Sequence, residues 1–198
     1  MEKLKSLERL EEALAKLPSV GKKSAERMAF AMLNFSDEDL LEMSEAIKEL
    51  KTNIRFCKTC GMICEDEECL ICKDENRNKE LLMIVSYPKD VFSIEKSGTY
   101  QGLYHILNGE IALSKGVHIE DLNLPSLYNR LDLGVIKEVI LATNPDSEGE
   151  MTALYLADLL RGLAGKISRL GYGVPLGAQL DYIDEMTLTH SLKGRTNL

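Results

Sequence analysis

The sequence lacks the features of a membrane or exported protein. None of its uncharged apolar runs comes near the roughly 18 residues that a bilayer-spanning helix needs, so we expect no membrane partner. The first residues are charged and amphipathic and lack the apolar stretch of a secretion signal, which predicts a cytoplasmic protein. Internal repeats and low-complexity tracts are missing too. With 44% apolar and 28% charged residues, the composition excludes wholesale disorder.

The chain is also short of positive charge. It has 24 Lys and Arg against 32 Asp and Glu, a formal net charge of −8. A general basic coat for nucleic acid is therefore excluded, and any DNA binding must depend on a local patch. Cysteine is confined to one stretch. The five cysteines all lie between positions 57 and 72. They are too close together for a disulfide framework, and an odd number cannot pair completely.

The pattern of apolar residues divides the 198-residue chain, which is long enough for one compact domain or two small ones. Apolar side chains at steps of three and four predict helices over 3–17 and 23–34. Ser36 followed by Asp39 is a capping box that opens a third helix. The first fifty residues or so are therefore predicted to form a small helical unit.

The second half of the chain alternates between predicted strands and helices. Short continuous apolar runs are typical of parallel strands buried on both faces. The candidate strands are 81–85, 104–107, 139–142 and, more weakly, 167–170. The helices expected between them are 90–96, 124–131 and 150–163. This alternation indicates an α/β sheet, followed by a glycine-rich linker and a tail of about twenty residues.

Four cysteines have the spacing of a zinc site. Cys57 and Cys60 form one CxxC pair, and Cys69 and Cys72 form a second after eight intervening residues. Two such turns supply four thiolates for a tetrahedral Zn²⁺ site with no open position, so its role is structural. Cys64 is the surplus thiol. The alternative is a reduced, metal-free or redox cluster.

The turn between the first two helices resembles a helix-hairpin-helix. Gly21 would let the backbone approach a phosphate closely, and free amides at the start of the next helix would face the anion. Lys22, Lys23 and Arg27 add positive charge at the same end, and residues 16–27 carry a local excess of +3, four basic residues against one acid. Such contacts read backbone charge, so binding is expected to be independent of DNA sequence. The alternative is an ordinary turn with solvated lysines.

An acidic motif follows the apolar run at 139–142. Asn144, Asp146, Glu148 and Glu150 lie where α/β folds place ligand-binding groups. The arrangement resembles the Toprim module, in which paired acids hold Mg²⁺ for phosphoryl chemistry. Here Asn144 is neutral, and Ser86 stands where such enzymes need glutamate, which leaves at most a weak Mg²⁺ site. Alternatively, Glu148 and Glu150 only offset the positive end of the following helix.

These features occur in the order found in one family. The chain resembles the RecR family of bacterial recombination mediators in the segments 17–27, 102–107, 142–145, 148–150 and 194–195 and in the four cysteines. Neutral Asn144 is usual in that family, whereas Lys22 stands where proline is common. The resemblance implies a multi-part α+β and α/β fold. Its parts are a helix-hairpin-helix domain over 1–52, a four-cysteine zinc motif over 53–80, a Toprim-like domain with a mainly parallel sheet over 81–173, and a C-terminal tail over 174–198 that docks on a neighbouring subunit.

The resemblance also implies a function. RecR proteins are non-enzymatic DNA clamps and adaptors that form ring-shaped tetramers. They act with RecO, and in some settings RecF, to load RecA onto single-stranded DNA coated by single-strand-binding protein. Carried over by position, Lys23 and Arg27 match DNA-contact residues, and Glu148 and Glu150 match the Toprim acids, where RecO binds. The alternative, a Mg²⁺-dependent Toprim nuclease or strand-cleaving enzyme, is distinguished by incubating the protein with plasmid and Mg²⁺.

Overall fold

The structure is a computed structural model that describes residues 4–195. The start of the charged N-terminus and the end of the predicted tail, residues 1–3 and 196–198, lie outside the described residues. The chain divides into two compact units, Met1–Ile54 and Arg55–Leu198. Within residues 4–195, no helix has the length and apolarity to cross a bilayer.

The first unit contains the three predicted helices. They are α1 (Lys5–Leu14), α2 (Lys22–Met32) and α3 (Asp37–Thr52). Ala25 and Ala29, two small residues on one face of α2, are fully buried and bring α2 close to its neighbours. The predicted capping box of α3 is confirmed, because Ser36 Oγ accepts from the Asp39 amide at 3.1 Å and the Asp39 carboxylate accepts from the Ser36 amide at 3.3 Å.

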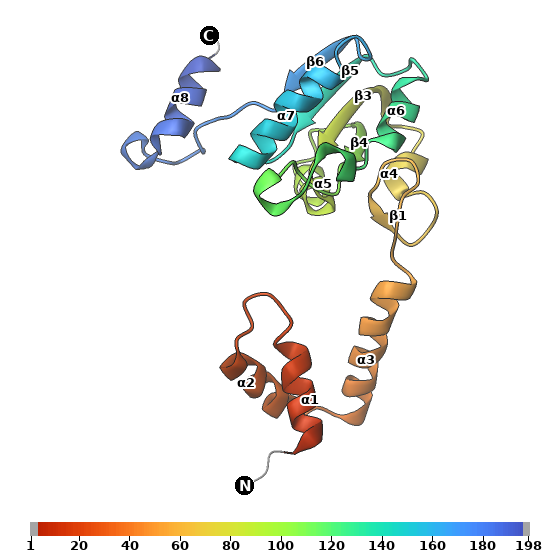
Figure 1. Ribbon diagram of the computed structural model, residues 1–198, viewed down its shortest axis with the longest axis vertical. Helices are drawn as coiled ribbons and strands as arrows, with labels where there is room; N and C mark the ends of the chain where they lie inside the picture. Colours follow the sequence, from red (N-terminus) through yellow and green to blue (C-terminus); the bar gives the residue numbers. More distant parts are fainter. Residues whose placement is uncertain (1–3, 196–198) are drawn as a thin grey trace. The chain divides into compact units, whose positions relative to one another are not determined.

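The second unit is built on a parallel four-stranded sheet, as predicted (Figure 1). Its strands, in spatial order, are β4 (Gly102–Ile106), β3 (Asn78–Val85), β5 (Glu138–Ala142) and β6 (Lys166–Arg169). Every pair of neighbouring strands in this sheet is parallel. All four strands therefore end at one edge, where Ser86 follows β3 and Thr143 and Asn144 follow β5.

The two faces of the sheet are covered by different elements. Leu82 and Ile84 of β3 face a core made with α6 (Pro125–Leu131) and α7 (Ser147–Leu159). Met83 and Val85, the alternate residues of the same strand, face a second core made with α5 (Pro88–Glu95) and with the cysteine motif. Because a parallel strand is buried on both faces, its residues form the continuous apolar run seen in the sequence.

Short elements complete the unit. The cysteine motif consists of an antiparallel pair, β1 (Arg55–Phe56) and β2 (Ile63–Cys64), followed by α4 (Leu70–Lys73). Three 3₁₀ helices cover Leu113–Lys115, Ile119–Asp121 and Leu180–Tyr182. The tail ends in α8 (Glu185–Lys193), whose His190 ring lies 4.8 Å from the ring of Tyr172. Five large apolar side chains of the tail are exposed, namely Leu176, Leu180, Tyr182, Met186 and Leu192, whereas Ile183 and Leu188 are half-buried.

Candidate zinc centre, nucleic-acid interface and acidic loop

The four predicted cysteine ligands meet at one point. The sulfur atoms of Cys57, Cys60, Cys69 and Cys72 all lie within 4.8 Å of one another. The Cys60 and Cys69 sulfurs are 3.5 Å apart, and those of Cys57 and Cys72 are 4.0 Å apart. A tetrahedron with Zn–S bonds of about 2.3 Å has sulfur–sulfur edges of about 3.8 Å, so the donor set fits zinc. Within residues 4–195 these cysteines are the one group of three or more potential ligands this close together.

The local fold explains why the thiols converge. The amide of Gly61 donates to the carbonyl of Cys57 at 2.9 Å and closes the first CxxC turn. Cys69 is the N-cap of α4, and α4 carries Cys72. The Cys60 carbonyl accepts from the amide of Ile106 at 2.7 Å, which ties the first turn to the sheet. Hydrogen bonding from Cys60 lowers the pKa of Cys69, which favours the thiolate form that zinc binds. With bound zinc, the site is a structural centre of four thiolates.

Cys64 lies outside this cluster. Its sulfur donates to the carbonyl of Asp66 at 3.0 Å, and it is not among the four sulfurs that lie within 4.8 Å of one another. The sequence prediction that Cys64 is the surplus thiol is therefore confirmed.

The hairpin between α1 and α2 presents an uncapped helix start. Gly21 is the N-cap of α2, no side chain caps the helix, and its first turn holds no acid. Side chains cap α3, α7 and α8, namely Ser36, Asp146 and Asp184, whereas α1 and α6, like α2, have no side-chain cap. A Cβ atom at Gly21 would meet nothing within 4 Å, so packing within the unit does not require glycine there. The open space and free amides are what a bound phosphate requires.

Packing changes the charge around this hairpin. Lys22, Lys23 and Arg27 are all exposed. A groove of about 360 Å³ between α1 and α2 is lined by both lysines, but also by Glu8, Glu11, Glu12 and Glu26. The local excess of +3 counted along residues 16–27 is thus partly offset by acids from α1 that lie apart in sequence. Arg27 does not line this groove.

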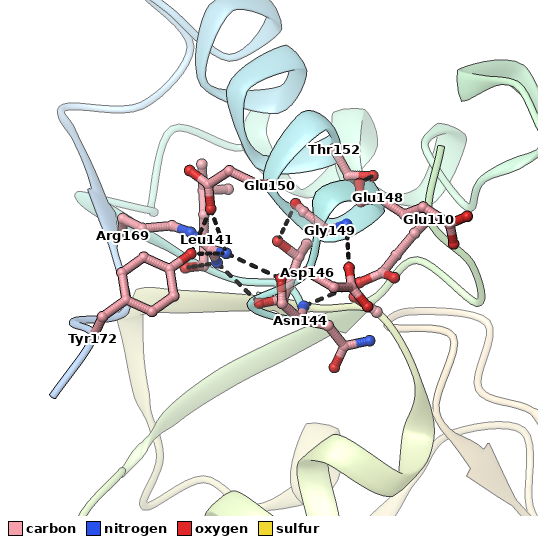
Figure 2. Close-up of polar contacts among 12 residues, drawn as sticks. Glu110, Leu141, Asn144, Asp146, Glu148, Gly149, Glu150, Thr152, Arg169 and Tyr172 are labelled. Atoms are coloured by element: carbon pink, nitrogen blue, oxygen red, sulfur yellow. Dashed lines mark hydrogen bonds and ion pairs between the residues drawn. The ribbon is translucent and has the colours of Figure 1, made fainter. Parts of the chain in front are cut away.

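The loop after β5 is organised by a buried carboxylate that the sequence analysis missed. Glu110 is only 5% exposed, and one of its oxygens accepts from the Asn144 amide at 3.0 Å (Figure 2). The same oxygen accepts from the Ser86 hydroxyl. Asp146 caps α7 by accepting from the Gly149 amide at 2.8 Å. Glu110 follows none of the sheet strands directly and belongs to no motif, so no sequence signal singles it out.

The remaining acids of the motif turn toward different partners. Glu148 pairs with Lys115 at 2.9 Å. Glu150 pairs with Arg169 at 3.2 Å and accepts from the Tyr172 hydroxyl (Figure 2). The hydrogen bond from Tyr172, followed by the contacts with Arg169, lowers the pKa of Glu150. The structure therefore places Asn144 and the three acids in one loop and helix turn but does not gather the acids around a shared point.

Arg169 connects this motif to the sheet edge. Its guanidinium donates to the carbonyls of Leu141 at 3.0 Å and Thr143 at 3.1 Å, in addition to Glu150. The sequence analysis assigned Arg169 only to a weak candidate strand and gave it no role. Its partners on and after β5 come close to it only when β5 and β6 pair. Tyr172, which contacts Glu150, Arg169 and His190, links the same cluster to α8.

Comparison with known proteins identifies the family. The RecR helix-hairpin-helix profile matches residues 7–51, and the RecR profile for a zinc finger domain with four cysteines matches residues 54–74. The Toprim domain profile matches residues 80–171, and the RecR C-terminal profile matches residues 173–196. The chain is 44% identical over 194 residues to Recombination protein RecR of Pelotomaculum thermopropionicum, covering 98% of this chain and 97% of the relative. The chain belongs to the RecR family.

A second relative agrees. Recombination protein RecR of Bifidobacterium longum subsp. infantis is 44% identical over 190 residues, covering 96% of this chain and 95% of the relative. As a RecR family member, the chain is a DNA-binding recombination and repair protein with a structural zinc centre. The helix-hairpin-helix, zinc and Toprim parts occur in the predicted order, and the predicted fold class is confirmed.

Proposed function

We propose that the protein is a non-enzymatic DNA-binding clamp and adaptor. It acts in the cytoplasm with RecO, and in some settings RecF, to load RecA onto single-stranded DNA coated by single-strand-binding protein. The observation that carries the DNA contact is the uncapped start of α2. There, Gly21 leaves the helix amides open, and Lys22, Lys23 and Arg27 are exposed beside them. These groups bind phosphates without reading bases.

The acidic loop supports an adaptor role over cleavage. Ser86 and Asn144 remove two negative charges from the positions that Mg²⁺-dependent Toprim enzymes use. The acids that remain are engaged elsewhere, with Asp146 capping α7, Glu148 paired with Lys115 and Glu150 paired with Arg169. A divalent ion needs several converging oxygens, so any Mg²⁺ here is bound weakly. We propose that RecO binds at the edge of the sheet that carries Asp146 and Glu148.

The apolar tail supports assembly. Five large apolar side chains of the tail are exposed within the unit that contains it, although a stretch of this length cannot bury them by itself. We propose that the tail docks on a neighbouring subunit in a ring-shaped tetramer that encircles DNA.

One experiment tests the proposed function directly. RecA filament growth is followed on single-stranded DNA coated by single-strand-binding protein, with RecO present and this protein added or omitted. We expect faster growth with the protein and a loss of that gain in the Asp146→Ala/Glu148→Ala variant, which retains the hairpin. Equal rates with and without the protein would reject the loading role. Plasmid cleavage with Mg²⁺ that Asp146→Ala abolishes would instead support the Toprim enzyme.

A further inference from the structure

A second candidate site for DNA lies on the zinc motif, in the second unit. Phe56, at the end of β1, is 60% exposed. It stands on a cleft of about 420 Å³ whose rim also includes Lys58, Asn108 and Asn123. The buried side chains of Leu107 and Leu122 line the same cleft. An exposed aromatic ring thus borders a recess with an apolar floor and amide groups on its rim.

The rim of this cleft is held in place by hydrogen bonds. Asn108, in the left-handed region at φ 58°, donates from Nδ2 to the carbonyl of Gly61 at 3.2 Å. Asn123 donates from Nδ2 to the carbonyl of Ile106 at 3.0 Å and accepts from the hydroxyl of Ser126 at 2.8 Å. Gly61 has φ +79°, and a Cβ atom there would lie 2.4 Å from Asn123 Nδ2. The cleft is therefore preformed, and glycine is required at position 61.

Charge distinguishes this cleft from the other groove with an exposed phenylalanine. Lys58 lies on the rim of the cleft, and its ammonium pairs at 3.1 Å with the carboxylate of Glu67, an exposed ion pair that contributes little, so a phosphate can replace the carboxylate. Arg55 is exposed next to Phe56 in the sequence but does not line the cleft. The rim also holds one acid, Asp121, whose carboxylate accepts from the backbone amide of His118 at 2.8 Å.

The groove beside Phe92 has the opposite character. It is lined by Glu65, Asp66, Glu68 and Glu95, and no cation of the described residues lines it. That groove is the more acidic of the two, although Lys73 pairs with Asp66 and Arg77 pairs with Glu95. The cleft at Phe56 instead offers a ring for stacking with Lys58 on its rim.

We propose that the Phe56 cleft takes a base of single-stranded DNA, stacked on the phenylalanine ring, with a neighbouring phosphate beside Lys58. Every base has an aromatic face, so such a site favours single strands without selecting a sequence. The proposal rests on the proposed DNA binding and adds a base-dependent contact to the phosphate contacts of the hairpin. It also predicts a preference for single-stranded over duplex DNA, because bases within a duplex are already stacked.

The absence of tryptophan from the chain allows a direct test. Phe56→Trp introduces the only indole, and its emission is followed while oligo(dT) is added. A matched oligomer of abasic nucleotides offers the same phosphates without bases. We expect quenching by oligo(dT) and little change with the abasic oligomer. Phe92→Trp, at a residue that is 55% exposed beside the acidic groove, is the control and should respond to neither.

A second variant measures the contribution of the ring to affinity. Phe56→Leu should weaken oligo(dT) binding about tenfold, the lower part of the range for base stacking, and leave the salt dependence unchanged. Zinc content equal to that of the unmodified protein shows that the variant is folded. Oligo(dT) binding, seen by anisotropy, that leaves the indole at position 56 unquenched overturns the base site and leaves the hairpin function standing.

Two further results would also reject the proposal. An emission change that depends on protein concentration alone, without DNA, assigns the cleft to an interface between copies. Failure of the unmodified protein to bind any oligonucleotide overturns the base site and the proposed function together.

Discussion

Removing the three hairpin cations tests the DNA contact most directly. In Lys22→Ala/Lys23→Ala/Arg27→Ala, three exposed side chains on α2 are shortened while the buried face, Ala25 and Ala29, is untouched. Exposed substitutions of this kind change the free energy of unfolding by less than about 0.5 kcal/mol each. Any change in DNA affinity therefore reports on the contact and not on the fold.

The expected magnitude follows from the number of contacts. Each neutralised phosphate of a single strand contributes about 0.7 to the slope of log affinity against log salt, so losing three contacts flattens the slope by about 2. A rise from about 50 to 200 mM salt should then weaken the unmodified protein about 20-fold more than the triple variant. The assay is fluorescence anisotropy of a labelled oligo(dT) titrated at several salt concentrations.

A matched variant separates the hairpin from net charge. Lys5→Ala/Lys48→Ala/Lys51→Ala removes three exposed cations from α1 and α3 and changes the total charge equally. Its salt slope should stay close to that of the unmodified protein. Equal slopes for the hairpin triple variant and the unmodified protein would refute the hairpin contact. Equal flattening in both variants would show that only overall charge matters.

The groove acids provide the reverse perturbation. Glu8 and Glu12 line the groove that contains Lys22 and Lys23, and both acids are exposed. Neutralising them in Glu8→Gln/Glu12→Gln should strengthen DNA binding at low salt by a few-fold, because two repulsive charges are lost. The gain should disappear as salt is raised, since exposed charges are screened. Unchanged binding in this variant at low salt would place the DNA path away from the groove.

Three further predictions concern the second unit. Chelation of zinc should lower the melting temperature of the whole second unit. It should also speed amide hydrogen exchange at Ile106, because this amide donates to the Cys60 carbonyl. An unchanged melting temperature would mean that the metal does not stabilise the fold. Glu110→Ala should lower the free energy of unfolding in urea by about 2–4 kcal/mol, because the Ser86 hydroxyl and the Asn144 amide lose their acceptor. Glu110→Gln keeps an acceptor oxygen and should lower it by about 1 kcal/mol or less. Equal losses in the two variants would show that the charge of Glu110, and not its hydrogen bonding, stabilises the loop. Burial lowers the pKa of His105 to about 4, so the unfolded chain binds the proton first and stability falls as pH drops from about 6.5 to 4, by about 3 kcal/mol. His105→Gln should remove that part of the pH dependence of urea unfolding, and an identical profile in the variant would contradict it.

Much of the architecture could be predicted from local patterns. The continuous apolar run at 81–85 predicted a strand buried on both faces, and β3 has that environment because α6 and α7 lie on one side and α5 and the zinc motif on the other. The paired CxxC spacing predicted the metal centre, since each turn brings two sulfurs together over a few residues. Ser36 and Asp39 predicted the start of α3 for the same local reason.

The sequence by itself thus determined the main helices and strands and the two CxxC pairs, because each depends on neighbours a few residues apart. The alternation of strands and helices indicated a parallel sheet, but the order of its strands was visible only in the structure. Only the tertiary structure decided which groups from distant segments meet. It brought Glu110 under the Asn144 loop and Arg169 against Glu150, and it placed α1 acids beside the hairpin lysines. Those contacts join residues from about 10 to 34 positions apart, and their energies depend on burial and distance, which no local pattern records.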